Sequence, residues 1–232
     1  QMQAFAEAVH ARVEAVDVLM NNAGVGLGGG LLETSLEDWH WIVDINLFGV
    51  VHGIHHFVPA MVRRGRGGHV VNVASMAGYI AGSMLPAYTT TKFAVIGLSE
   101  SLREELAPHR IGVTAVCPGI INTGIVQASR LRGAQASEAS RAEMQRGFAR
   151  RNYTPERVAE NVLRAIQRNR AVTNGVKSFG MNGALPRSGT ENPQIKSRVG
   201  SRRLLELQQD PAIDAANRDI LVESNRVRVV IA

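Results

Sequence analysis

Tyr88 and Lys92 stand four residues apart, and Ser75 precedes the tyrosine by thirteen residues. On a helix, four residues rise roughly 6 Å and return to the same face, so a cation would lie beside a phenol. Free tyrosine has a pKa of about 10 and is a poor acid or base near neutral pH, whereas a neighbouring cation favours the phenolate. The trio therefore predicts a reaction that moves a proton on or off an alcohol or carbonyl oxygen.

The tyrosine and lysine pair is weak evidence by itself, because a chain of this length shows Tyr-x-x-x-Lys by chance roughly one time in two or three. Tyr88 also fits a packed aromatic at a helix start, and a serine such as Ser75 is most often a turn residue. The presence of Lys92 beside the phenol and of Ser75 before it favours catalysis.

The elements around these residues alternate between strand and helix. Short apolar runs, typical of parallel strands buried on both faces, occur at Val16–Asn22, His69–Val73 and Gly112–Cys117. Helical patterns occur at Leu36–Arg64, at Ala87–Leu106 and after Thr154-Pro155. This alternation requires crossover connections and predicts an α/β fold with a parallel sheet. Ser75 would lie at the carboxyl edge of that sheet, where such folds bind ligands.

The longest helical pattern, Leu36–Arg64, carries two possible start signals. Thr34-x-x-Glu37 and Ser35-x-x-Asp38 both have capping-box spacing. Pro59 lies inside the pattern, so we expect it to kink the helix or mark its last turns.

Four sequence blocks, taken with the Tyr-x-x-x-Lys pair, carry a resemblance to a known family. They are Asp17–Gly24, Asp44–Gly49, Val70–Ser75 and Val116–Gly119. In order and spacing they resemble the short-chain dehydrogenase/reductase family over residues 1–175. The resemblance implies a Rossmann-like doubly wound parallel sheet and an NAD(P)-dependent oxidoreductase that interconverts a secondary alcohol and a ketone. It also implies a small-molecule substrate, a homodimer or homotetramer, and a cytoplasmic location.

The resemblance further implies a set of site residues. Those with catalytic roles are Asn46, Ser75, Tyr88 and Lys92. Those that contact the cofactor, NAD or NADP, are Asn21, Ala23, Gly24, Tyr88, Lys92, Pro118, Gly119, Ile121 and Thr123. In the family, the asparagine at the place of Asn46 holds a water that links the lysine to solvent. Tyr88 is the acid or base, and Lys92 lowers the pKa of Tyr88 and binds the nicotinamide ribose.

One part of the family pattern is missing from this sequence, which reads as N-terminally truncated. No glycine-rich turn follows a first strand, and the glycine cluster Gly24–Gly30 comes after the strand Val16–Asn22 instead. We interpret that cluster as a flexible loop beside the active site rather than a pyrophosphate cradle. We also expect an open apolar edge along Val16–Asn22 and at best millimolar cofactor binding.

The composition is compatible with a protein that has a single sizeable core, and it argues against several other classes of protein. The chain has 232 residues, of which 45% are hydrophobic, and no unbroken apolar run approaches the roughly 20 residues of a membrane span. Its net charge of +6 comes from late arginines that interleave with glutamates, so we predict no nucleic-acid surface. The single cysteine, Cys117, fits a reducing compartment and a small buried hydrophobe. His52, His55 and His56 could ligate a metal, but no acidic ligand accompanies them, and we predict no metal site.

We divide the chain into a family domain, residues 1–185, and a polar C-terminal extension of unknown role, residues 186–232. Within the extension, Val227, Val229 and Ile231 alternate with arginines. Ile125 to Asn152 is expected to form a lid over the substrate. Two other functions remain open: a non-catalytic relative that cannot hold the cofactor, and a sugar-nucleotide epimerase or dehydratase, for which the extension is too short and too polar.

Overall fold

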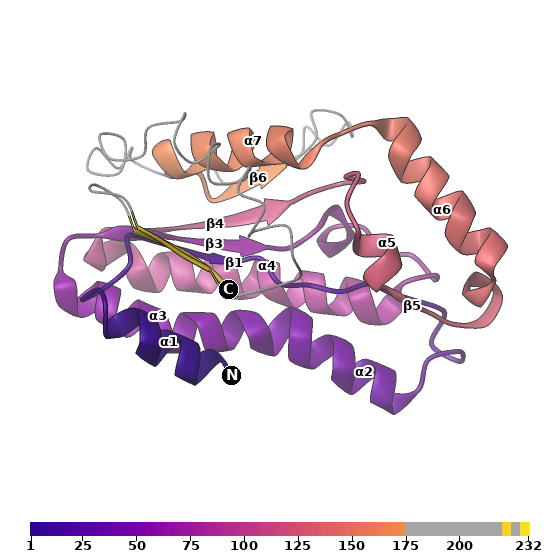
Figure 1. The fold of residues 1–232 in the computed structure, drawn as a ribbon, viewed down its shortest axis with the longest axis horizontal. Coiled ribbons are helices and arrows are strands. Elements are labelled where there is room, and N and C mark those ends of the chain that lie inside the picture. The colour runs from indigo at the N-terminus through magenta and orange to yellow at the C-terminus, as the bar shows by residue number, and fades with distance from the viewer. Residues whose placement is uncertain (175–219, 224–227) are drawn as a thin grey trace.

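The computed structural model describes residues 1–174, 220–223 and 228–232, and these form an α/β fold around one six-stranded sheet (Figure 1). The strand order is β6-β4-β3-β1-β8-β7, and all neighbours are parallel except β7 and β8. The strands of this sheet are β1 (Val18–Asn21), β3 (Gly68–Val73), β4 (Ile111–Cys117), β6 (Val172–Asn174), β7 (Ile220–Glu223) and β8 (Arg228–Ile231). The Rossmann-like parallel sheet predicted from the sequence is confirmed.

Helices cover both faces of the sheet, as Figure 1 shows. They are α1 (Met2–His10), α2 (Leu36–Val43), α3 (Gly49–Arg64), α4 (Pro86–Leu106), α5 (Ile125–Ala128), α6 (Glu138–Arg151) and α7 (Pro155–Gln167). Helices α1, α3 and α4 pack on one face through a core that includes Phe57, Met61 and Leu102. Helix α7 packs on the other face through Val162 and Ile166. The β-strands are therefore apolar throughout because both of their faces are buried.

The predicted helix Leu36–Arg64 forms, but a π-helical turn, η1 (Asp44–Phe48), interrupts it. Ser35 and Asp38 form the capping box at its start. Pro59 lies inside α3, which continues to Arg64 and ends at the left-handed Gly65. By length and composition, the helical span Leu36–Arg64 could cross a membrane. Charged and polar residues interrupt it, so it contains no unbroken apolar run. Here it lies against the sheet, with Phe57 and Met61 fully buried, as a core helix does.

The expected open edge along β1 is wrong. Strand β8 lies parallel to β1 at that edge, with Leu19 opposite Val230. The valines that alternate with arginines late in the chain supply an apolar strand, and burying it removes the unpaired edge. The predicted domain boundary at residue 185 lies outside the described residues.

The glycine cluster is not a free loop. Leu27–Gly28 forms strand β2, which pairs in parallel with β5 (Arg130–Leu131) of the predicted lid. A side chain at Gly26 would collide with Ser129, and one at Gly28 would collide with Gln135. The lid side chains thus pack closely on this segment, and small residues leave them room.

Candidate active site

Tyr88 and Lys92 lie on the same face of α4, which begins with Pro86 at its first position. The Lys92 Nζ is 5.7 Å from the centroid of the Tyr88 ring. The lysine is buried and 4% exposed, and its Nζ donates a hydrogen bond of 3.0 Å to the carbonyl oxygen of Val73 at the end of β3. Helix periodicity and the end of β3 together place an ammonium beside a phenol at the carboxyl edge of the sheet.

Ser75 follows β3 directly and reaches the same place. Its Oγ accepts a hydrogen bond of 3.1 Å from the backbone N–H of Ala77, which fixes the serine at the start of a short 3₁₀ turn, η2 (Met76–Gly78). The Ser75 side chain also lies near enough to the Tyr88 phenol to lower the pKa of that phenol. Three of the four predicted catalytic side chains are therefore in one cluster.

Burial controls the proton affinities of the two ionisable groups in this cluster. It raises the pKa of Tyr88 above its ordinary value of 10.0, although the hydrogen bond to Ser75 acts in the opposite direction. It lowers the pKa of Lys92 to about 8. The net shift of the Tyr88 pKa in the protein without cofactor is therefore upward, because removing the phenolate from water outweighs its other interactions. A lowering of this pKa by Lys92 together with the bound nicotinamide stays a prediction.

Asn46 is fully buried within the π-helical turn and holds the start of the glycine cluster. Its Oδ1 accepts from the N–H of Val25 at 2.8 Å, and its Nδ2 donates to the Val25 carbonyl at 2.9 Å. The same Nδ2 lies 3.3 Å from the hydroxyl oxygen of Thr91, which had no signal in the sequence beyond its place before Lys92. Asn46 therefore positions the segment next to Lys92 by binding the backbone of Val25.

The segment after β1 passes close to both of these residues. Ala23 is exposed and Gly24 is half-buried. A Cβ added to Gly24 would lie 3.4 Å from Asn46 Oδ1 and 3.5 Å from Lys92 Nζ. A larger residue would crowd both groups, so the backbone here runs along the cluster at close range.

Asn21 differs from its neighbours because its side chain points into the protein. Its Nδ2 donates to Asn72 Oδ1 at 2.8 Å, and Asn72 in turn donates to Ser99 Oγ at 2.9 Å. The Asn21 Oδ1 is buried and has no hydrogen-bond partner among the described residues. A side chain at Gly53 would collide with that oxygen. The Asn21 side chain therefore joins strands and α3 inside the protein.

The turn after β4 is fixed against Ser75. The N–H of Met76 donates to the Pro118 carbonyl at 2.9 Å, and Pro118 and Gly119 are half-buried. Ile121 is buried, whereas Thr123 is exposed and its hydroxyl lies 3.4 Å from the N–H of Ile125 at the start of α5. Thr123 is therefore turned toward the start of α5, and Pro118 binds the backbone directly after the serine.

Cys117 ends β4 beneath this turn. It is fully buried, and burial raises the pKa of its thiol to about 12. The thiol is therefore protonated at neutral pH and is a poor nucleophile.

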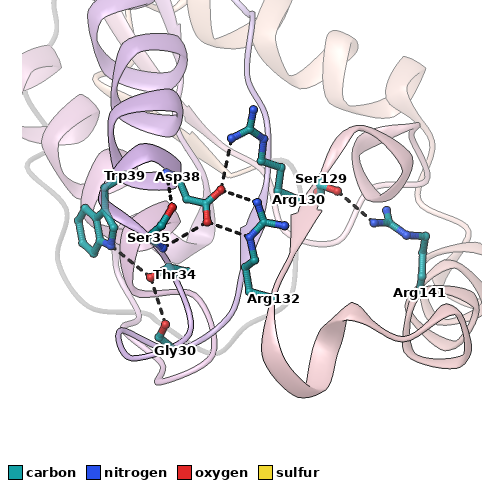
Figure 2. A network of polar contacts seen from close by, with 9 residues as sticks. All are labelled: Gly30, Thr34, Ser35, Asp38, Trp39, Ser129, Arg130, Arg132 and Arg141. Atoms are coloured by element: carbon teal, nitrogen blue, oxygen red, sulfur yellow. Dashed lines mark hydrogen bonds and ion pairs between the residues drawn. The ribbon is translucent and has the colours of Figure 1, made fainter.

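An ion-pair cluster that the sequence did not reveal anchors the lid (Figure 2). The buried carboxylate of Asp38 accepts two hydrogen bonds from Arg132, at 2.8 and 2.7 Å, and a third from Arg130 at 3.3 Å. The Arg130 guanidinium also lies 4.1 Å from the centroid of the Trp41 ring. These charge-assisted hydrogen bonds hold the pKa of Asp38 far below its ordinary value. Asp38 was visible in the sequence only as a capping residue, so its second role was missed.

Arg141 makes a further contact inside the lid. Its guanidinium donates to the carbonyl of Val126 at 2.5 Å and to that of Ser129 at 3.2 Å, the latter shown in Figure 2. Helix α6 is thereby tied to α5, while none of the α6 residues is buried. Within the described residues, no group of three or more His, Cys, Asp or Glu side chains is arranged to hold a metal ion.

Comparison with known proteins identifies the family of this chain. Residues 1–133 match the short chain dehydrogenase family. A protein of Mycobacterium tuberculosis named "Probable oxidoreductase EphD" is 38% identical over 175 residues, which cover 74% of this chain and 30% of that protein. The "C alpha-dehydrogenase" of a Sphingobium species is 34% identical over 162 residues, which cover 67% of this chain and 53% of that protein. The chain thus spans only 30% and 53% of the lengths of these two relatives.

Solved structures show the same likeness. A short chain dehydrogenase/reductase from Burkholderia phymatum, crystallised in complex with NAD, superposes with a TM-score of 0.69 at 30% identity, covering 91% of this chain and 74% of that one. A short-chain dehydrogenase from Streptomyces avermitilis gives a TM-score of 0.65 at 29% identity, covering 75% of this chain and 65% of that one. This chain belongs to the short-chain dehydrogenase/reductase family, and the family predicted from the sequence is confirmed.

Proposed function

We propose that the protein is an NAD(P)-dependent oxidoreductase that interconverts a secondary alcohol and a ketone, with Tyr88 as the acid or base. The observation that carries this proposal is the position of the buried Lys92 ammonium, 5.7 Å from the centroid of the Tyr88 ring, with Ser75 near the same phenol. A phenol and a serine hydroxyl that converge at the carboxyl edge of a parallel sheet can bind one substrate oxygen between them. The named relatives that are oxidoreductases or dehydrogenases support the reaction class.

The residues around Lys92 fit a nicotinamide cofactor. A buried ammonium has three donors, and among the described residues its one hydrogen bond is to Val73. Burial of a charge is costly unless further partners satisfy it, and ribose hydroxyls are such partners. The backbone of Ala23 and Gly24 and the turn at Pro118 and Gly119 would line the same cofactor. The cofactor is NAD or NADP.

When bound, the nicotinamide supplies the hydride to the carbonyl carbon or accepts it from the alcohol. Ser75 orients the substrate oxygen, because its own hydroxyl is held by the Ala77 N–H. Tyr88 gives a proton from its Oη as the carbonyl is reduced and takes it back as the alcohol is oxidised. Lys92, kept in place by Val73, favours the phenolate in the second direction. Asn46 contributes by holding Val25 and the backbone beside the lysine.

The test is a turnover assay with a panel of secondary alcohols and ketones, using NAD(H), NADP(H) and reduced nicotinamide mononucleotide. We expect cofactor-dependent turnover in the wild-type protein that Tyr88→Phe removes. The mononucleotide is informative because it lacks the adenosine half and needs only the residues described here. Turnover with none of the three cofactors on any substrate would contradict the proposal.

A non-catalytic relative is the second candidate, and one observation favours it. Burial raises the pKa of Tyr88, which makes its phenolate harder to form. This candidate predicts no turnover with any cofactor, including the mononucleotide. The first candidate predicts slow turnover with the mononucleotide even where dinucleotide binding is only millimolar.

We also propose that the protein is a cytoplasmic homodimer or homotetramer without nucleic-acid partners or a membrane span. Phe48 and Phe93, at α3 and α4, are 47% and 44% exposed, and exposed aromatics on helix faces are typical of subunit interfaces. We also propose that the chain consists of a family domain, residues 1–185, and a C-terminal extension, residues 186–232. Sedimentation analysis of the wild type and of Phe93→Ser tests the assembly, because loss of this contact should favour the monomer.

A further inference from the structure

Strand β8 lies at the place that a first strand takes in a doubly wound sheet. In the order 3-2-1-4-5-6, the first strand pairs in parallel with the fourth. Strand β1 of this chain corresponds to that fourth strand, since Ser75 and Lys92 follow it in family order. Strand β8 pairs with it in parallel, with Val18 opposite Val229 and Leu19 opposite Val230. A strand from late in the sequence thus pairs with β1 on the side opposite β3.

The beginning of β8 is fixed by Asp17. The Asp17 N–H donates to the Arg228 carbonyl at 2.9 Å, and one carboxylate oxygen of Asp17 accepts from the Arg228 N–H at 3.0 Å. The other carboxylate oxygen lies 2.9 Å from the guanidinium of Arg64 on α3. A largely buried ion pair with Arg64 therefore orients the Asp17 carboxylate that binds the start of β8. This charge-assisted contact is more specific than apolar contact alone.

The end of β8 lies at the carboxyl edge of the sheet. The carbonyl of Ala232 accepts from the N–H groups of Asn22 and Ala23, at 2.6 and 3.1 Å. The N–H of Ala232 donates to the Met20 carbonyl at 2.8 Å. Asn22 and Ala23, which follow β1 toward the candidate active site, therefore both donate to the carbonyl of Ala232, directly after β8.

The strand is buried on both faces. Val230 is fully buried in the core under α1 and α3, and Val229 is 5% exposed in the core under α7. Burial of these valines stabilises the docked strand, because it removes apolar surface from water. The apolar contacts and the ladder together make β8 a stably docked strand.

We infer that docking of β8 beside β1 positions the cofactor-facing segment Asn22–Gly24. The step from strand to site is short: Ala232 holds Asn22 and Ala23, and the next residue, Gly24, borders Lys92. The strand-docking part stands on the hydrogen bonds alone, whereas the cofactor part rests on the proposed function. Strand docking and cofactor binding would be linked, so each strengthens the other.

Hydrogen exchange on the full chain tests the docking part, with Val230→Ala and Val113→Ala as a matched pair. Both valines are buried in the same core, but Val113 lies on β4, away from β8. We expect Val230→Ala to speed exchange of the Asn22 and Ala23 amides by about tenfold relative to the β3 amides. Val113→Ala should not single out those two amides. The same exchange pattern in both variants overturns the inference, and so does wild-type exchange of Asn22 and Ala23 at the rate of an unstructured peptide.

Calorimetric titration with NAD tests the positioning part in the same three proteins. We expect the dissociation constant to rise by about threefold or more in Val230→Ala, and less in Val113→Ala. Equal affinities in the two variants overturn the positioning role. Absence of NAD binding in the wild type overturns the positioning role and the proposed cofactor together, while the exchange data still decide whether β8 is docked.

Discussion

Lys92 Nζ lies 5.7 Å from the centroid of the Tyr88 ring and donates its hydrogen bond to the Val73 carbonyl, not to the phenol. The lysine is thus held by the sheet and acts on the tyrosine through space. Its charge is buried, and burial lowers its pKa to about 8. This relationship makes the charge state of the site depend on pH just above neutrality.

Lys92→Met should weaken NAD(P) binding and slow turnover, because it removes the ammonium while keeping most of the side-chain volume. In the wild type, the lysine loses its proton as pH rises through about 8, so cofactor affinity should fall across that range. In Lys92→Met the affinity should be low and independent of pH. Fluorescence titration with NADH between pH 6.5 and 9.5 measures both. A wild-type affinity that does not change above pH 8 would show that the ammonium does not contact the cofactor.

Removal of the buried lysine should also change stability with a defined sign. The pKa of Lys92 is lower in the folded state than the ordinary 10.5, so the unfolded chain binds more protons between pH 8 and 10.5. The free energy of unfolding of the wild type should therefore receive a rising contribution from this group across that window. Urea unfolding of the wild type and Lys92→Met at several pH values isolates the contribution as a difference between the two curves.

Asp38→Asn should loosen the lid, because it removes the carboxylate that binds Arg130 and Arg132. The arginines are 35% and 41% exposed, so solvent screening limits the loss of unfolding free energy to about 1–2 kcal/mol. Limited trypsin digestion should cut within residues 130–141 several-fold faster than in the wild type. Glu37→Gln is the matched control, since Glu37 is an exposed neighbour in the same helical turn. Equal cleavage rates in Asp38→Asn and Glu37→Gln would mean that the ion pairs do not hold the lid.

His69 should make the protein acid-sensitive. It is fully buried, and its Nε2 lies 2.8 Å from the hydroxyl oxygen of Thr114, which itself donates to the Arg170 carbonyl. The hydroxyl can only accept from the ring, so Nε2 carries a proton. Burial lowers the pKa of His69 to about 3, so the imidazole is neutral near neutral pH. Stability from this group is present above pH 6.5 and is lost as pH falls toward 3, by up to about 5 kcal/mol.

The comparison of His69→Gln with His109→Gln checks this expectation, since His109 is exposed. Urea unfolding between pH 4 and 7 should show a steep acid dependence in the wild type and in His109→Gln. His69→Gln should show a shallower dependence, because it lacks the buried imidazole. The same slope in all three proteins would assign the acid sensitivity to other groups.

The sequence predicted the positions of β1, β3 and β4 and the proximity of Ser75, Tyr88 and Lys92 because these depend on local patterns. Apolar runs fix buried strands, and the helical period fixes the relative placement of Tyr88 and Lys92. Ser75 was predictable because it directly follows a strand in a parallel sheet.

The remaining features depend on contacts between distant parts of the chain. The π-helical turn contains Asn46, whose side-chain amide binds the backbone of Val25. The hydrophobic periodicity of the sequence does not predict such a contact between distant residues. The pairing of β8 with β1 joins residues that are more than 200 positions apart, so alternation near the C-terminus could predict a strand but not its neighbour. The ion pairs of Asp38 with Arg132 were hidden for the same reason.

Substitution of the phenol tests the central claim most directly. In Tyr88→Phe the ring, its packing and the helix remain, and only the Oη that moves the proton is removed. We predict that turnover with NAD(H), NADP(H) or reduced nicotinamide mononucleotide falls by about 100-fold or more, while the dissociation constant for the cofactor changes by less than about threefold. Measurement of kcat and of cofactor affinity in the same preparation gives both numbers. Turnover that remains above a few per cent of the wild type, at unchanged affinity, would show that Tyr88 is not the acid or base.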